Sequence, residues 1–293
     1  MARGAVGIWT PGPSAVVEGV MATDAEPPKP PTLWRCSMRP RIWRGRRANL
    51  PTRQPAAAFV HWPRSAGVCD TEGMFLQIEN FLTAEEVRSI TQIAQQAKFV
   101  DGRRSNPHNL TKDSLIADPS DPIAQKASQI ALAAFQRNEQ VRDFALPHRL
   151  AVPSLCRYDV GMKYGAHVDA AYLPVGTQPL RSDVSCTIFL SKPSDYQGGE
   201  LVAHIGSELV TIKGEEGSAV LYPSTTVHQV MPVSSGERLV IITFIESQIA
   251  DQLQRDLLYS LGEIRALEAL KMDWRNRVQL DYVIQNLHRM WSR

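Results

Sequence analysis

The spacing of hydrophobic positions changes along the chain and divides it into regions. Residues 1–73 show neither a helical nor a strand period. Apolar positions recur at helical spacing in residues 74–149, in short alternating runs in residues 150–247, and at helical spacing again in residues 248–293. The pattern predicts a disordered extension, an N-terminal helical support, a β-sheet core and C-terminal helices, in that order.

Two helices are predicted ahead of the β-rich region. Thr83 is followed three residues later by Glu86, as in a capping box that begins a helix. Pro122 is suited to the first turn of a second helix. The polar residues 101–121 between them are expected to form a loop. The apolar stripes of the two helices are Val87, Ile90, Ile93, Ala94 and Ala97, and Ile123, Ala127, Ile130, Ala131 and Ala134.

The central region has the pattern of many short strands separated by Gly, Pro, Asp and Ser turns. Such spacing is typical of a sandwich or jelly roll. With the helices before and after it, the chain is predicted to have an α+β fold. The expected strands are Ala151–Tyr158, Val184–Leu190, Glu200–His204, Glu208–Lys213, Ser218–Tyr222, Gln229–Val233 and Arg238–Glu246.

The C-terminal region carries two apolar stripes at helical spacing. These stripes predict packing against the β-sheet core or, alternatively, the face of a homodimer. Their members are Leu253, Leu257, Leu258 and Leu261, and then Val278, Tyr282, Val283, Leu287 and Met290.

Charge and composition narrow the classes of partner. The formal net charge is only +2, and residues 1–70 hold ten Lys/Arg against four Asp/Glu, so the basic character belongs to the extension and not to the body. No apolar run reaches membrane-spanning length. We therefore expect neither nucleic acid nor a membrane as partner. Cys156 and Cys186 lie in strand-like runs without a CxxC pair, which suits free buried thiols in a cytoplasmic protein.

The main candidate for chemistry is His167-Val168-Asp169. In a strand, residues i and i+2 point to the same face, so an imidazole and a carboxylate would project together into one cavity. One further histidine would complete a facial triad, the arrangement by which non-haem Fe(II) oxygenases bind a bidentate co-substrate and O₂. The tripeptide alone is a weak signal, and a hydrogen-bonded pair on a surface strand is its alternative explanation.

His228 is the candidate for the third ligand, and Arg238 follows it at the start of an apolar strand. A guanidinium entering a core needs an anionic partner, because an unpaired buried charge is very costly. The far carboxylate of a metal-chelating 2-oxo acid would be such a partner, and Tyr158 is a candidate to donate a hydrogen bond to it. The alternatives are a core histidine at 228 and a surface arginine at 238. His204 is expected to be structural or to line the pocket, and not to be a ligand.

Several further segments agree with one known family. From Met74 to the C-terminus the sequence resembles the PKHD-type hydroxylases, which are related to the prolyl and lysyl hydroxylases among the Fe(II)/2-oxoglutarate dioxygenases. The matching segments are Arg157–Gly161, Tyr164–Asp169, Arg181–Thr187, Asp195–Leu201, Leu221–Ser224, Val227–Val230 and Gln254–Leu258.

The resemblance implies a fold, cofactors and a reaction. The fold would be a double-stranded β-helix, or jelly roll, with iron at His167, Asp169 and His228, 2-oxoglutarate at Arg238, and L-ascorbate as reductant. The reaction would couple O₂-dependent decarboxylation of 2-oxoglutarate to hydroxylation of a substrate. Small molecules, siderophores and protein side chains all suit an open barrel mouth. A demethylase, or a non-catalytic sensor that binds iron and 2-oxoglutarate, would retain the same residues.

Overall fold

The computed structural model describes residues 7–8, 75–106 and 109–292. The predicted disordered extension, residues 1–73, lies outside the described residues except for Gly7–Ile8. The described residues belong to one compact unit.

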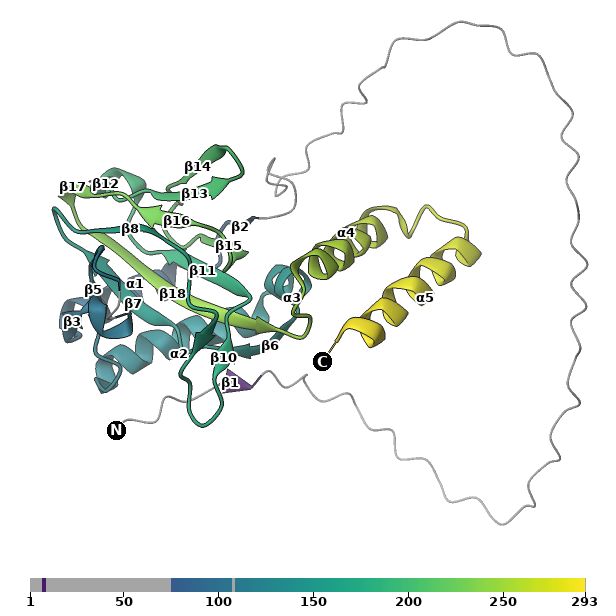
Figure 1. Ribbon diagram of the computed structural model, residues 1–293, viewed down its shortest axis with the longest axis horizontal. Helices are drawn as coiled ribbons and strands as arrows, with labels where there is room; N and C mark the ends of the chain where they lie inside the picture. Colours follow the sequence, from purple (N-terminus) through teal and green to yellow (C-terminus); the bar gives the residue numbers. More distant parts are fainter. Residues whose placement is uncertain (1–6, 9–74, 107–108, 293) are drawn as a thin grey trace, which may run out of the picture. The chain divides into compact units, whose positions relative to one another are not determined.

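The larger of two main sheets has nine antiparallel strands, in the order β2-β15-β11-β18-β7-β5-β3, with β6 beside β18 and β1 beside β6. The long strand β18 lies at its centre and pairs with β11 along most of its length (Figure 1). The strands are β1 (Gly7–Ile8), β2 (Leu76–Ile78), β3 (Phe99–Asp101), β5 (Leu115–Ala117), β6 (Pro147–Leu150), β7 (Ser154–Tyr158), β11 (Val184–Phe189), β15 (Ala219–Pro223) and β18 (Arg238–Ser247).

The smaller sheet has five antiparallel strands in the order β14-β13-β16-β8-β4. It faces the larger sheet, and apolar side chains from both sheets form one cluster between them, among them Val240 and Phe189 from one and Ala203 and Val230 from the other. The two sheets form a jelly-roll core of the double-stranded β-helix type. The strands are β4 (Lys112–Asp113), β8 (Lys163–His167), β13 (Leu201–Ile205), β14 (Glu208–Ile212) and β16 (His228–Val230).

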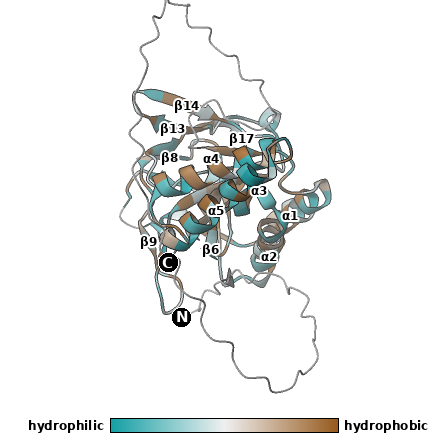
Figure 2. Ribbon diagram, turned by 90° about the vertical axis from the view of Figure 1, so that its right-hand side faces the viewer, coloured by the Kyte–Doolittle hydropathy of each residue, from teal (hydrophilic) through white to brown (hydrophobic). Residues whose placement is uncertain are grey.

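Helices α1 (Ala84–Gln96) and α2 (Pro122–Arg137) cover the outer face of the larger sheet (Figure 1). Both helices carry hydrophobic and hydrophilic residues, and their hydrophobic positions join the core (Figure 2). The capping box of Thr83 and Glu86 is present at the start of α1. The short helix α3 (Glu139–Ala145), which the sequence did not predict, follows α2.

The predicted loop over residues 101–121 is wrong in part. It contains the 3₁₀ helix η1 (Gly102–Ser105) and the strands β4 and β5, each of which extends one of the two main sheets. Strands of two and three residues leave no periodic signal in a sequence, because pairing with a neighbouring strand and not local pattern determines them.

The chain ends in the helical hairpin α4 (Gln252–Glu268) and α5 (Trp274–Trp291). Of the two predicted stripes, Leu258 is buried and Leu261 and Leu287 pack beside it. Leu253 and Tyr282 are exposed. The alternative of a homodimer face stays a prediction. No helix in residues 75–106 and 109–292 is long and apolar enough to span a bilayer.

Short accessory strands complete the structure. The pairs are β9 (Tyr172–Leu173) with β10 (Leu180–Arg181), and β12 (Tyr196–Gly198) with β17 (Val233–Gly236); the 3₁₀ helix η2 (Pro193–Asp195) precedes β12.

Candidate active site

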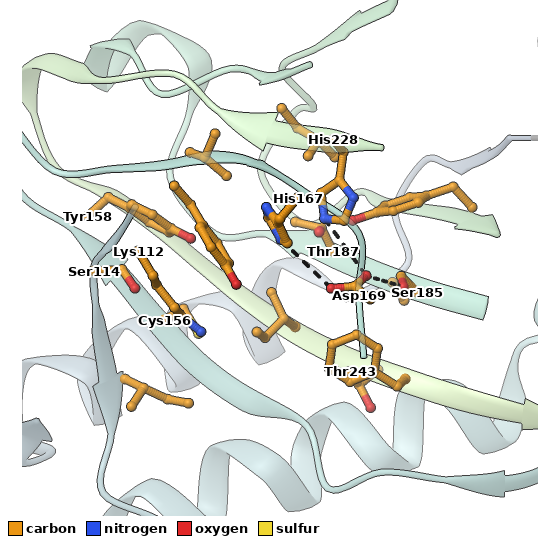
Figure 3. A pocket seen from close by; sticks show the side chains of 18 of the residues that line it. Lys112, Ser114, Cys156, Tyr158, His167, Asp169, Ser185, Thr187, His228 and Thr243 are labelled. Carbon is orange, nitrogen blue, oxygen red and sulfur yellow. Dashed lines mark hydrogen bonds and ion pairs between the residues drawn. The ribbon is translucent and has the colours of Figure 1, made fainter. Parts of the chain in front are cut away.

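Sheet register brings two of the candidate ligands together. Strands β8 and β16 are antiparallel neighbours, and His167 pairs directly with His228. Asp169 follows two residues later, after the end of β8, so the expectation that it shares a strand with His167 is wrong. Its carboxylate nevertheless turns to the two imidazoles, with Nε2 of His167 and Nε2 of His228 each 3.8 Å from an Asp169 oxygen (Figure 3). One ligand atom from each residue lies within 4.8 Å of the others.

Each imidazole is oriented by the backbone just before it. Nδ1 of His167 donates to the carbonyl of Gly165 at 2.8 Å, and Nδ1 of His228 donates to the carbonyl of Thr226 at 2.9 Å. Because a carbonyl only accepts, both Nε2 atoms are left with a lone pair that points to the shared space. The donor set of two imidazole nitrogens and a carboxylate therefore fits a divalent iron ion.

Electrostatics also favour a neutral imidazole at His167. Burial, and after it the neighbouring His228, lower the pKa of His167 to about 4, while the hydrogen bond to Gly165 opposes that shift. A histidine must be neutral to ligate a metal. His167 therefore does not have to lose a proton at neutral pH before it binds an ion.

Asp169 is held by a chain of buried serine hydroxyls. Ser185 on β11 donates to Asp169 Oδ2 at 2.6 Å. The Ser185 hydroxyl is 2.7 Å from that of Ser224, which in turn accepts from Ser182 at 2.8 Å. Because all three serines are buried, the chain fixes the carboxylate without help from solvent. These serines were not predicted from the sequence.

Aromatic rings enclose the imidazoles. Tyr164 stacks on His167 with ring centroids 3.6 Å apart, and Tyr222 meets His228 edge-on at 5.2 Å. The Tyr164 hydroxyl accepts from Asn106 Nδ2 at 3.0 Å. These contacts limit the rotation of both imidazoles.

Arg238 enters the same cavity from the first position of β18. It pairs in register with Tyr158 on β7, and its guanidinium lies 5.0 Å from the centre of the Tyr158 ring. Only 2% of Arg238 is exposed, and its Nε has no hydrogen-bond partner among the residues that the structure describes. A buried guanidinium with an unused donor is suited to an anionic ligand. Gly199, at φ +66°, leaves room for it, since a Cβ there would lie 3.0 Å from Arg238 Cδ.

The predicted residues line a single cavity. His167, Asp169, His228, Arg238 and Tyr158 all face it. Figure 3 shows Tyr158 on one side, Asp169 and His228 on the other, and His167 between them.

Two features of the cavity differ from the sequence-based expectations. His204, expected to be structural or to line the pocket, is exposed on β13 and is not among the lining residues. Lys112 of β4 was not predicted, yet it is buried and lines the cavity.

Sequence comparison defines the class of protein. Residues 153–246 match the 2OG-Fe(II) oxygenase superfamily. This segment includes all five of the predicted site residues, which fall on the β-sheet core.

The relatives then define the family. The chain is 47% identical over 207 residues to a PKHD-type hydroxylase of Sphingopyxis alaskensis, a match that covers 71% of this chain and 94% of the relative. A PKHD-type hydroxylase of Alteromonas mediterranea is 37% identical over 223 residues, covering 73% of this chain and 98% of the relative. The chain belongs to the PKHD-type hydroxylases, and it is an oxidoreductase of the Fe(II)/2-oxoglutarate dioxygenase class.

Solved structures with a similar fold are more distant. A Pseudomonas putida prolyl-4-hydroxylase is 20% identical, with a TM-score of 0.42 and coverage of 60% of this chain and 94% of that one. A Trichoplax adhaerens prolyl hydroxylase, in complex with a hypoxia inducible factor peptide fragment, is 20% identical, with a TM-score of 0.46 and coverage of 64% and 87%.

Proposed function

We propose that His167, Asp169 and His228 hold one Fe(II) ion, that Arg238 and Tyr158 bind 2-oxoglutarate, and that the enzyme hydroxylates a C–H bond of an organic substrate. The observation that carries the proposal is the convergence of three ligand atoms within 4.8 Å of one another in a cavity that also holds a buried arginine.

Together, Fe(II) and 2-oxoglutarate supply a reaction with O₂ in which the oxo acid becomes succinate and CO₂ and the second oxygen atom enters a C–H bond. The protein positions the ion and the co-substrate. His167 and His228 would hold the ion through Nε2, and Ser185 keeps the Asp169 carboxylate beside them as the third ligand. With Asp169 as a ligand, a halide would have no free place on the ion, which favours hydroxylation over halogenation.

Arg238 would orient the co-substrate. Its planar guanidinium is suited to bidentate contact with the carboxylate remote from the metal. The Tyr158 hydroxyl stays protonated, because burial raises its pKa well above the ordinary value. It can therefore donate a hydrogen bond to the same carboxylate throughout the neutral pH range.

The decisive experiment measures succinate. We propose L-ascorbate as the reductant that keeps the iron ferrous. With Fe(II), 2-oxoglutarate and L-ascorbate, the purified chain should form succinate slowly without added substrate, and only in the presence of O₂. A sensor would bind 2-oxoglutarate but form no succinate, and that result would refute the proposal.

The substrate requires a separate measurement. Small molecules, siderophores and protein side chains are the proposed classes. Cell extract incubated with the enzyme under ¹⁸O₂ should contain a species that gains one labelled oxygen atom. Release of formaldehyde without retention of the label would instead indicate a demethylase.

A further inference from the structure

The cavity contains a second buried cation that the proposed function does not use. Lys112 lies on β4, in register with Tyr164 of β8, and is 7% exposed. Its Nζ donates to Ser105 Oγ at 2.7 Å and lies 4.9 Å from the centre of the Tyr164 ring. An ammonium has three donors. Among residues 75–106 and 109–292, no carboxylate forms an ion pair with Lys112.

Lys112 shares the cavity with the proposed iron ligands. Tyr164 contacts both Lys112 and His167, so one aromatic ring connects the ammonium to a proposed iron ligand. Figure 3 shows the Lys112 side chain extending into the cavity that Asp169 and His167 face. Lys112 therefore lines the same cavity as the proposed iron ligands.

Lys112 would have no compensating anion in the cavity once iron and 2-oxoglutarate are bound. The carboxylates whose charge favours a protonated Lys112 are those of Asp169 and Asp101. A divalent ion bound at the triad would more than cancel the charge of Asp169. The ion and Asp169 together carry one positive charge, Arg238 adds a second, and dianionic 2-oxoglutarate balances both. Lys112 then remains without an anion in the cavity, and Asp101 is already paired with Arg103. Burial already lowers the pKa of Lys112, a cost that a bound anion would offset.

We propose that Lys112 is an anion subsite that takes a carboxylate, or a group of equivalent charge, carried by the substrate. The inference rests on the proposed function, because it assumes that iron and 2-oxoglutarate occupy the rest of the cavity. It narrows the substrate to an anionic class.

The competing role for Lys112 is a contact to 2-oxoglutarate itself. That role would give the dianion three cationic partners, counting the metal, and would leave the cavity with an excess positive charge. The two roles differ in one observable: an anion subsite for the substrate stays available when 2-oxoglutarate is bound, whereas a co-substrate contact is blocked by it.

Bromide is a direct probe, because it carries one negative charge and is located by its anomalous scattering. Crystals of the full chain loaded with Zn(II), which does not turn over, and saturated with 2-oxoglutarate would be soaked in bromide. We expect a bromide ion in contact with Lys112 Nζ. The site should persist in Lys112→Arg and disappear in Lys112→Met.

Two results would overturn the inference. One is the absence of bromide at Lys112, or its equal occupancy in Lys112→Met. The other is bromide that binds at Lys112 only when 2-oxoglutarate is omitted, which would assign the lysine to the co-substrate. Thermal unfolding of both variants checks that they are folded, and Lys112→Arg keeps the test valid if Lys112→Met does not fold.

Measurement of 2-oxoglutarate affinity in solution tests the same proposal. Loss of a buried charge pair weakens binding by roughly 30-fold or more. We therefore expect the affinity of the Zn(II) protein for 2-oxoglutarate to fall by such a factor in Arg238→Met but by a much smaller factor in Lys112→Met. Equal losses would contradict the inference. Because no turnover is involved, a failure here is distinct from a failure to form succinate, which would reject the proposed function.

Discussion

The two ends of the cavity satisfy their polar groups in different ways. At the metal end, formed by His167, Asp169 and His228, both Nδ1 atoms and one carboxylate oxygen are bonded within the protein. At the cationic end, formed by Arg238 and Lys112, a guanidinium nitrogen has no partner and no carboxylate pairs with the ammonium among the described residues.

The difference indicates what each end needs. The metal end is preorganised, so that a small ion can bind with little rearrangement. The cationic end lacks counter-charges until anionic ligands bind. A cavity whose one end binds a cation and whose other end binds anions fits a metal ion together with a dianion that chelates it. Each substitution below is expected to disturb one end of the cavity and leave the other intact.

The largest effect is expected from His167→Ala. Removal of one of three ligands should abolish both Fe(II) binding and O₂-dependent succinate formation. His204→Ala, which changes an exposed histidine on β13, is the matched control and should retain both. Retained succinate formation in His167→Ala would mean that iron is held elsewhere.

Arg238→Met should disturb the cationic end alone. We expect the KM for 2-oxoglutarate to rise by roughly 30-fold or more, with a far smaller change in Fe(II) affinity. Arg157→Met is the control, because Arg157 lies on the neighbouring strand but pairs with Asp159 outside the cavity. Equal losses of iron and 2-oxoglutarate affinity would argue against separate roles for the two ends.

Ser185→Ala should disturb the metal end less severely than loss of a ligand. Partners that orient metal ligands typically contribute 10- to 100-fold in affinity, so Fe(II) affinity should fall by about that factor. Ser218→Ala, a serine that donates only to the Glu215 carbonyl, is the control. An unchanged affinity in an Fe(II) titration would show that the serine chain does not hold Asp169.

The smallest effect is expected from Gly199→Ala. A non-glycine residue at positive φ costs about 1–3 kcal/mol, and here the new Cβ would also press on Arg238. Gly206→Ala has φ +59° but nothing within 4 Å, so it carries similar backbone strain without the contact. Both variants should lose stability in thermal unfolding, and only Gly199→Ala should weaken 2-oxoglutarate binding. Equal affinity for 2-oxoglutarate in the two variants would show that Gly199 does not help to position Arg238.

Much of this arrangement was predictable from the sequence because its signals are local. The alternation and turns of the central region place β11, β15 and β18 within one or two residues of their observed bounds. The capping box at Thr83 begins α1 as expected. His228 and Arg238 could be named from the sequence, because a polar or charged side chain beside an apolar strand needs a binding partner.

The remainder depended on contacts between distant segments. Lys112 lies in a polar stretch, and only the pairing of β4 with β8 buries it. Ser185 is an ordinary residue until the fold brings it to Asp169, although a signal was present: Ser185 and Thr187 alternate along a fully buried strand, which is typical of a strand that faces a polar cavity.

The most direct test of the central claim is a crystal structure of the full chain grown without O₂ in the presence of Mn(II), as a stand-in for iron, and 2-oxoglutarate. The account predicts one anomalous peak bonded to Nε2 of His167, Nε2 of His228 and the carboxylate of Asp169, with the remote carboxylate of 2-oxoglutarate on Arg238. A metal bound by other side chains, or a co-substrate that leaves Arg238 without an anion, would contradict it.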